Sequence, residues 1–131
     1  MDYRNGRFHV TWVYRGFVHY EGWDDPHDTK HKQQAGPNGA ENNHGIFYAY
    51  SDDKGYTWQN GRGEIIASLR EGETVNNNCD GILAVDIPKA RGLTNQESQA
   101  VDQDGGVHIL NRDNLNGELL WKHYYRSPEG E

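Results

Sequence analysis

Residues 51–58 constrain the fold of this chain more than any other stretch. The run before it, residues 46–50, is apolar and aromatic with a strong preference for β-strands, and Trp58 opens another short run of the same kind. Asp53 is placed to accept hydrogen bonds from backbone N–H groups of a tight turn, and Gly55 tolerates a positive φ. We therefore predict a β-hairpin turn in which Asp53 is a structural residue and not a catalytic acid.

The composition favours one small all-β domain. The 131 residues include 16 glycines and one methionine, and only 34% are hydrophobic, which is typical of a turn-rich β-protein. The net charge of −7 argues against nucleic acid as a partner, because phosphate binding needs a basic surface. No apolar run reaches the length of a membrane span, so we expect no membrane partner. The single cysteine, Cys79, excludes an internal disulfide.

The hydrophobic pattern predicts strands and no helix. Residues 7–15 alternate between two faces, with Val10 and Trp12 on one face and His9 and Thr11 on the other. Residues 19–44 show no sustained period and many turn-forming residues, which predicts a long loop. Further strands are expected at residues 46–50, 97–101, 107–110 and 118–125, with shorter strand pieces at 65–67 and 82–85.

An internal repeat links the two halves of the chain. Residues 6–10 match residues 105–109, and residues 48–51 match residues 124–127, with an insertion in the first copy. A repeated strand pair is the sequence signature of propeller blades. We expect the first copy to lack the innermost strand that the second copy has. The chain would then begin and end inside a blade, as part of a longer protein.

The predicted organisation is a single partial β-propeller domain over residues 1–131. Its parts are a first blade at 1–62 with the inserted loop 19–44, a connection at 63–94, and a truncated second blade at 95–131. Two partial blades would leave large apolar faces uncovered, because blades bury their faces against neighbours. We therefore expect these faces to be covered by the remaining blades of a longer chain or by self-association.

Several motifs together resemble a known family. Ser51, Asp53, Gly55, Thr57 and Trp58 stand at the positions of the Asp-box of BNR-repeat, sialidase-like β-propellers. Residues 7–15, 43–44, 93–96 and 100–105 are similar to the branch of this family that includes the ulvan lyases. The resemblance covers most of the chain and implies an all-β propeller that acts on carbohydrates. It also implies a secreted or periplasmic protein, with the signal peptide upstream of residue 1.

The resemblance also implies an active site. Ulvan lyases cleave uronic-acid polysaccharides by β-elimination, in which a base removes the proton α to the carboxylate and an acid protonates the leaving oxygen. His44 stands in the Asn-His motif of the family and is the expected catalytic residue, because a neutral imidazole suits either role. Arg15 matches the arginine that closes the family's Trp-x-x-Arg strand, and it suits a bidentate grip on a carboxylate. A structural role for His44 in the hairpin is the competing interpretation.

The other expected substrate contacts belong to the same side of the propeller. The loop between strands two and three and the connection between blades share one face, opposite the Asp-box turn. These expected contacts are Asn43, Trp23, Asn95, Gln96 and Arg112. Trp23 has the alternative role of anchoring the inserted loop, and Arg112 that of a solvated side chain.

We predict no metal site and no cofactor. The inserted loop is rich in histidine and aspartate, but the spacings match no compact zinc pattern and the segment is hydrophilic throughout. The side chains weighed are His19, His27, His31 and His44 with Asp24, Asp25 and Asp28.

Three functions remain open from the sequence. The leading one is a polysaccharide lyase that acts on uronate-containing glycans. A sialidase-type glycoside hydrolase is the alternative enzyme, although such enzymes hold the substrate carboxylate with three arginines and only Arg15 and Arg112 are well placed here. The third is a glycan-binding propeller without catalysis, because a fold does not determine a function.

Overall fold

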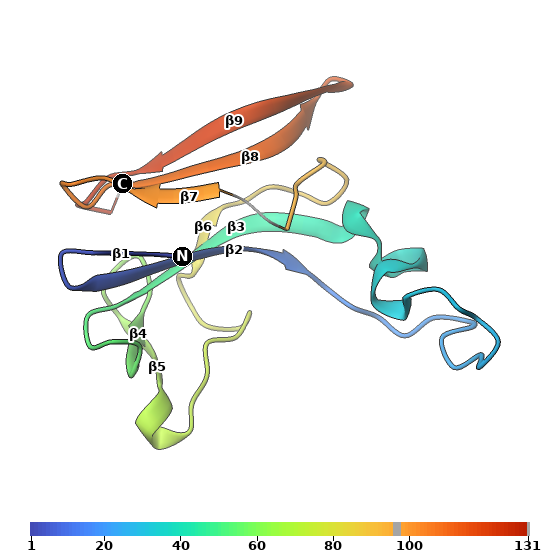
Figure 1. The fold of residues 1–131 in the computed structure, drawn as a ribbon, viewed down its shortest axis with the longest axis horizontal. Helices are drawn as coiled ribbons and strands as arrows, with labels where there is room; N and C mark the ends of the chain where they lie inside the picture. Colours follow the sequence, from blue (N-terminus) through green and yellow to red (C-terminus); the bar gives the residue numbers. More distant parts are fainter. Residues whose placement is uncertain (96–97, 131) are drawn as a thin grey trace.

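The protein is an all-β chain of two antiparallel sheets, as the sequence predicted. The computed structural model describes residues 1–95 and 98–130, and in these it contains β-strands, four short 3-10 helices and no α-helix. The two sheets lie one over the other, and a long loop projects beyond them (Figure 1). No helix in the described residues is long and apolar enough to cross a membrane.

The first sheet has the strand order β1-β2-β3-β4-β5, and β6 pairs with β3 outside this path. Its strands are β1 Asp2–Arg4, β2 Arg7–Arg15, β3 Asn43–Ser51, β4 Thr57–Gln59, β5 Ile65–Ser68 and β6 Leu83–Val85. The second sheet has the order β7-β8-β9, with β7 Ser98–Val101, β8 Val107–Leu115 and β9 Glu118–Arg126. The 3-10 helices are Lys32–Gln34, Gly36–Asn38, Ala40–Asn42 and Leu69–Glu71.

The amino end differs from the expectation, because a strand precedes β2. β1 pairs antiparallel with β2, with Asp2 opposite His9, and it takes the place in the first sheet that β7 takes in the second. Asn5 and Gly6 join the two strands and both have positive φ, at 52° and 85°, which suits a tight hairpin. Three residues are too few to show an alternating pattern, so sequence reasoning missed this strand. Glu97, which was expected to begin the strand that ends at Val101, lies outside the described residues.

β8 is longer than the sequence pattern indicated. It was expected to end at Leu110 but continues to Leu115, and its polar residues Asn111 and Asp113 are buried. Asn111 bonds to Thr94, and Asp113 pairs with two cations described below. Buried polar groups with partners are stable in a strand, but they hide its hydrophobic period.

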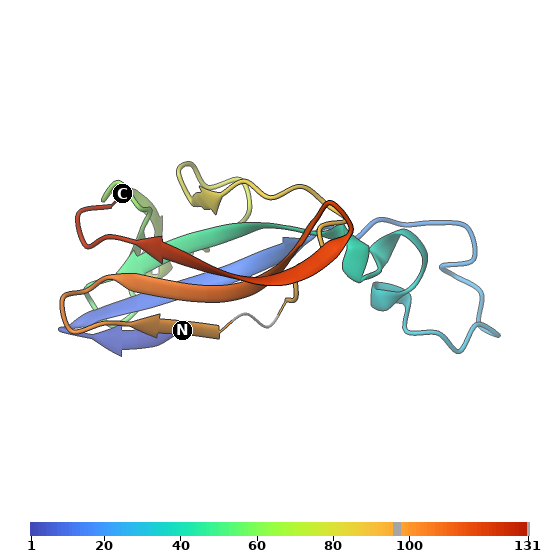
Figure 2. The ribbon, with the colours of Figure 1, turned by 90° about the horizontal axis from the view of Figure 1, so that it is seen from above.

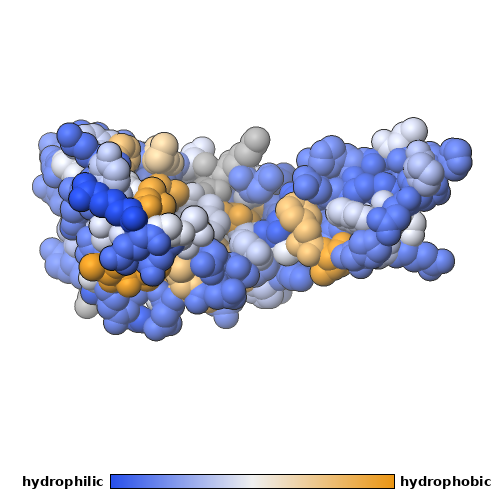
Figure 3. Space-filling view, turned by 90° about the horizontal axis from the view of Figure 1, so that it is seen from below, coloured by the Kyte–Doolittle hydropathy of each residue, from blue (hydrophilic) through white to orange (hydrophobic). Residues whose placement is uncertain are grey.

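The hydrophobic core lies between the two sheets. Its buried side chains are Ile46, Tyr48, Tyr50, Ile87, Leu93, Val101, Val107 and Ile109. In β2 the buried residues are His9 and Thr11, so Val10 and Trp12 turn to the outer face of the first sheet and stay half-buried. From the side of β4 and β5, hydrophobic residues form separate patches in a largely hydrophilic surface (Figure 3).

Hydrogen bonds join the edges of the two sheets. The backbone N–H and hydroxyl of Thr11 donate to Gln99 Oε1 at 3.2 and 3.0 Å, and Gln99 Nε2 donates to the His9 carbonyl at 3.2 Å. The Val101 N–H donates to Asp2 Oδ2 at 2.8 Å. These contacts bring β1 and β2 next to β7, and they fix the position of one sheet relative to the other.

The turns gather at the two ends of the molecule. The β1–β2 and β7–β8 turns and the hairpin between β3 and β4 lie at one end, and the inserted loop and the β8–β9 turn lie at the other (Figures 1 and 2). This is the division of turns that a propeller blade predicts. The inserted loop runs between Arg15 and Asn43, and it ends earlier than expected because Asn43 and His44 already belong to β3.

Candidate functional site

The hairpin at residues 51–58 is held by its own side chains. The hydroxyl of Ser51 donates to Asp53 Oδ1 at 2.9 Å and accepts the Gly55 N–H at 2.8 Å, while Asp53 Oδ1 also accepts the Thr57 N–H at 2.7 Å. This N–H bond is the main cause that lowers the pKa of Asp53 below its ordinary value. Gly55 has φ 89°, and β4 begins directly after the turn, with Thr57 opposite Ser68 and Trp58 opposite Ala67. The contacts of Asp53 are those of a turn-stabilising residue.

At the opposite end, a β-bulge sets the direction of the site residues. The register between β2 and β3 shifts so that Val13 faces Ile46 while Tyr14 faces His44, and Gly45 is the extra residue. Gly45 has φ 63°, which favours glycine. Because of this extra residue, His44 does not share the core face with Ile46 but lies on the outer face with Tyr14.

Arg15 and Asn43 meet on the inner side of the bulge. Arg15 Nε donates to Asn43 Oδ1 at 2.7 Å, and Asn43 Nδ2 donates to the Leu93 carbonyl at 2.7 Å. Asn43 is 1% exposed, so both ends of its amide are directed into the protein. Asn43 therefore positions Arg15 and the connection before β7, and it has no exposed surface to offer a ligand.

His44 lies in an aromatic setting that leaves one ring nitrogen free. Its ring is edge-on to Tyr14, with centroids 5.5 Å apart, and to Phe47 at 6.2 Å. Nδ1 lies 3.1 Å from the Asn42 carbonyl, and a carbonyl can only accept, so Nδ1 carries the proton in this contact. The lone pair of the neutral ring is then on Nε2, which has no hydrogen-bond partner within the described residues. This is the tautomer that a general base needs.

The connection before β7 is joined to the same end of the molecule. The N–H and hydroxyl of Thr94 donate to Asn111 Oδ1 at 3.0 and 3.2 Å, and Asn111 Nδ2 donates back to the Thr94 carbonyl at 3.0 Å. Asn95 follows and is exposed, so it is available for contacts. Gln96, also predicted to bind substrate, lies outside the described residues. Asn43 therefore holds the connection at Leu93, and Asn111 holds it at Thr94.

The structure does not bring Arg112 or Trp23 to His44. Arg112 follows Asn111 in β8 and therefore lies on the outer face of the second sheet, opposite Trp121 in the register. Trp23 packs within the inserted loop against Tyr20, at 5.5 Å, and His19, at 5.9 Å. Its contacts support the loop-anchoring role.

Sequence reasoning missed a charged cluster that joins the second sheet to the connection before β7. Asp113 is 3% exposed, and its Oδ2 lies 2.9 Å from Lys122 Nζ in a hydrogen bond. Its Oδ1 lies 2.8 Å from a terminal nitrogen of Arg91, at an angle that makes an ion pair but no hydrogen bond. The spacing of the three residues in the chain carries no motif, so only the fold shows that they meet.

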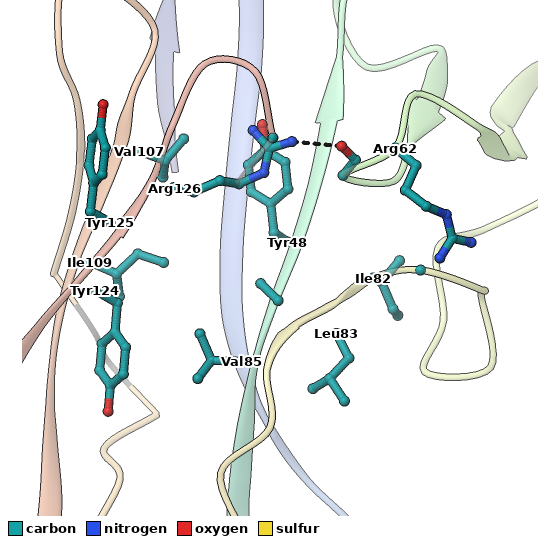
Figure 4. A pocket seen from close by; sticks show the side chains of 14 residues that line it. Tyr48, Arg62, Ile82, Leu83, Val85, Val107, Ile109, Tyr124, Tyr125 and Arg126 are labelled. Atoms are coloured by element: carbon teal, nitrogen blue, oxygen red, sulfur yellow. Dashed lines mark hydrogen bonds between the residues drawn. The ribbon is translucent and has the colours of Figure 1, made fainter.

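A cavity of about 270 Å³ separates β9 from the segment that contains β6. Its wall is mainly apolar, with Ile82, Val85, Val107 and Ile109 around it and Arg126 lying over the Tyr48 ring at one end (Figure 4). Tyr124 and Tyr125 of β9 also line it. The lining of this cavity does not include Tyr14, Arg15, Asn43 or His44.

The two blade-like sheets, the hairpin of residues 51–58 and the division of the loops define a partial β-propeller with an Asp-box turn. A protein-family model described as "BNR repeat-containing family member" matches residues 1–131, the whole chain. The protein therefore belongs to the BNR repeat-containing family, which indicates a sialidase-like repeat protein of the carbohydrate-active kind. A search of curated proteins found no match.

Proposed function

We propose that the protein is a polysaccharide lyase that cleaves uronic-acid glycans, of the ulvan-lyase kind, with the active site at the end that carries the inserted loop. The observation that supports this best is His44, whose tautomer leaves Nε2 free beside Tyr14. Family membership supports a carbohydrate as the substrate. A secreted or periplasmic location belongs to the same proposal.

The proposed chemistry is a β-elimination. His44 Nε2 removes the proton from the carbon α to the uronate carboxylate, and the C–H electron pair becomes the new carbon–carbon double bond. The glycosidic carbon–oxygen bond breaks, and the leaving oxygen keeps that electron pair and takes a proton from water. Arg15 is the proposed carboxylate ligand, because no described residue bonds its two terminal nitrogens. Since Arg15 and His44 lie on opposite faces of the sheet, the proposal requires the substrate to bind over the ends of β2 and β3, where Arg15 and Asn43 form the last pair.

The test is product formation with a panel of uronate polysaccharides, ulvan included. β-Elimination creates an unsaturated uronate, whose ultraviolet absorbance is followed over time. We expect the absorbance to rise with the native protein and to stay flat with His44→Ala, while glycan binding is kept. His27→Ala is the matched control, because His27 is an exposed histidine of the inserted loop to which the proposal gives no role.

Each other outcome points to a different function. Equal turnover in His44→Ala would remove His44 from the mechanism. New reducing ends without unsaturated product would indicate the alternative enzyme, a sialidase-type hydrolase. Binding with neither product would indicate a glycan-binding propeller.

One observation favours the binding function specifically. The outer face of the first sheet has a hollow of about 460 Å³, lined by Trp12, Tyr14 and Trp58 with the amides of Asn76 and Asn77 at its edge. Ligand pockets commonly combine aromatic walls with a few polar groups that set orientation. This hollow therefore supports glycan binding as the second candidate function, whether or not cleavage takes place.

A further inference from the structure

A polar cavity lies at the other end of the molecule, beside the turns that are remote from the inserted loop. Its volume is about 430 Å³, and both sheets contribute to its wall. Its ionisable lining residues are Arg4, Arg7, His9, Asp52, Asp104 and Arg126. We name it the basic cavity.

Two arginines of the basic cavity are held rigidly. The Arg7 guanidinium lies 3.9 Å from the centre of the Tyr50 ring, and Nε and a terminal nitrogen bond to Asp52 at 2.6 and 2.9 Å. The Arg126 guanidinium lies 4.6 Å from the centre of the Tyr48 ring. One of its terminal nitrogens donates to the Gly61 carbonyl at 2.7 Å, the bond drawn in Figure 4. Fixed guanidinium groups lose little entropy when they bind an anion.

The charges of this cavity do not cancel. Arg7 is neutralised by Asp52, but the partners of Arg126 are the backbone carbonyls of Gly61 and Ser127, which carry no formal charge. Three arginines face two aspartates, a formal excess of one positive charge in a chain whose net charge is −7. An excess of positive charge in a concave site attracts anions.

His9 forms the inner wall and supplies a neutral donor. It is 3% exposed, and its Nδ1 lies 2.9 Å from the Tyr48 hydroxyl. Burial, with the charges of Arg7 and Arg126, lowers the pKa of His9, so the ring is neutral near pH 7. Burial also raises the pKa of Tyr48 to about 12, so Tyr48 keeps its proton and can donate it to Nδ1. The ring proton of His9 is then on Nε2.

We propose that the basic cavity binds an oxyanion, a sulfate or carboxylate group, with Arg4 and Arg126 as its charged contacts and His9 Nε2–H as a neutral donor. The shared chemistry is a negatively charged group with several acceptor oxygens, which planar guanidinium groups match. The site lies at the opposite end from His44, so it stands or fails independently of the lyase proposal.

The test is a titration of the purified protein with sodium sulfate and with sodium glucuronate at constant ionic strength, followed by the NMR signals of the His9 ring. We expect saturable shifts with either salt. Arg4→Gln should weaken binding about tenfold, since a lost charge-assisted hydrogen bond contributes about 1.4 kcal/mol, which is a factor of ten in affinity. Arg126→Gln should weaken it as much, provided that its backbone amide spectrum shows the native fold.

Two control variants make the outcome decisive. Arg70→Gln removes a guanidinium that also lies 4.6 Å from a tyrosine ring, that of Tyr56, but lies outside the cavity lining, so it should leave the affinity unchanged. His44→Ala should also leave it unchanged. Shifts that do not saturate, or an affinity unaltered by Arg4→Gln, would overturn the proposal; Arg4 is exposed, so its loss does not threaten the fold.

A uronate oligosaccharide identifies the source of the anion. Tighter binding of the oligosaccharide than of free glucuronate would show that the group is carried by a glycan. Equal affinity for sulfate, glucuronate and the oligosaccharide would show that the cavity takes a free oxyanion. Either pattern supports the proposed site only if Arg4→Gln also weakens the binding.

Discussion

At the residue scale, Gly45 decides which face of β3 carries His44. Its φ is 63°, and a Cβ there would lie 2.9 Å from Cε2 of Phe47 and 3.0 Å from Cδ1 of Leu83. We predict that Gly45→Ala lowers the free energy of unfolding by about 1–3 kcal/mol, from backbone strain and this crowding, and impairs any activity that uses His44. Urea unfolding measures the loss. Gly16→Ala, at an open position with ordinary φ, should change it by less than about 1 kcal/mol; equal effects would refute a special role for Gly45.

At the element scale, the buried charge of Asp113 ties β8 to β9 and to the preceding connection. Its carboxylate faces Lys122 in β9 and Arg91 before β7. We predict that Asp113→Ala destabilises the protein by about 1–3 kcal/mol, because Lys122 and Arg91 lose their partner, although their side chains, 37% and 29% exposed, keep access to water. The measurement is again urea unfolding, with Asp86→Ala, an exposed aspartate, as the control. A loss of less than about 1 kcal/mol in the free energy of unfolding would show that these ion pairs do not stabilise the fold.

At the scale of the whole molecule, the two sheets are joined by their core and by a few hydrogen bonds at one edge. One of these bonds depends on pH, because the Val101 N–H is the main cause that lowers the pKa of Asp2 below 3.8. A carboxyl group with a lowered pKa in the folded state stabilises the protein above its ordinary pKa, and this contribution is lost as pH falls through the folded value. Acid should therefore weaken the contact between β1 and β7.

We predict that Asp2→Asn makes stability less sensitive to acid. The urea midpoint of the native protein should fall between about pH 5 and about pH 2, and the variant should lose less over the same interval because position 2 no longer titrates. Asp53 and Asp102 also have a lowered pKa, so part of the acid effect remains in the variant. The same slope in both proteins would show that the Asp2–Val101 contact does not contribute.

Much of the fold could be predicted from the sequence, and less of the candidate site. The long strands appear through alternation, and the hairpin at residues 51–58 through residues that have few other local uses. β1 was missed because it is three residues long, and the second half of β8 because Asn111 and Asp113 break the apolar pattern. Arg15, Asn43 and His44 were placed at the correct end of the molecule, but their division between the two faces of the sheet was not visible.

The sequence by itself determined the all-β class, the repeated strand pairs, the Asp-box turn and the family, because these depend on residues that are neighbours in the chain or recur at a fixed period. Only the tertiary structure decided that Gly45 is a bulge and that Asp113 meets Arg91 and Lys122. It also decided that Arg4 and Arg126 share one cavity. The physical reason is that such contacts form between groups far apart in the chain, and no local preference of either partner specifies them.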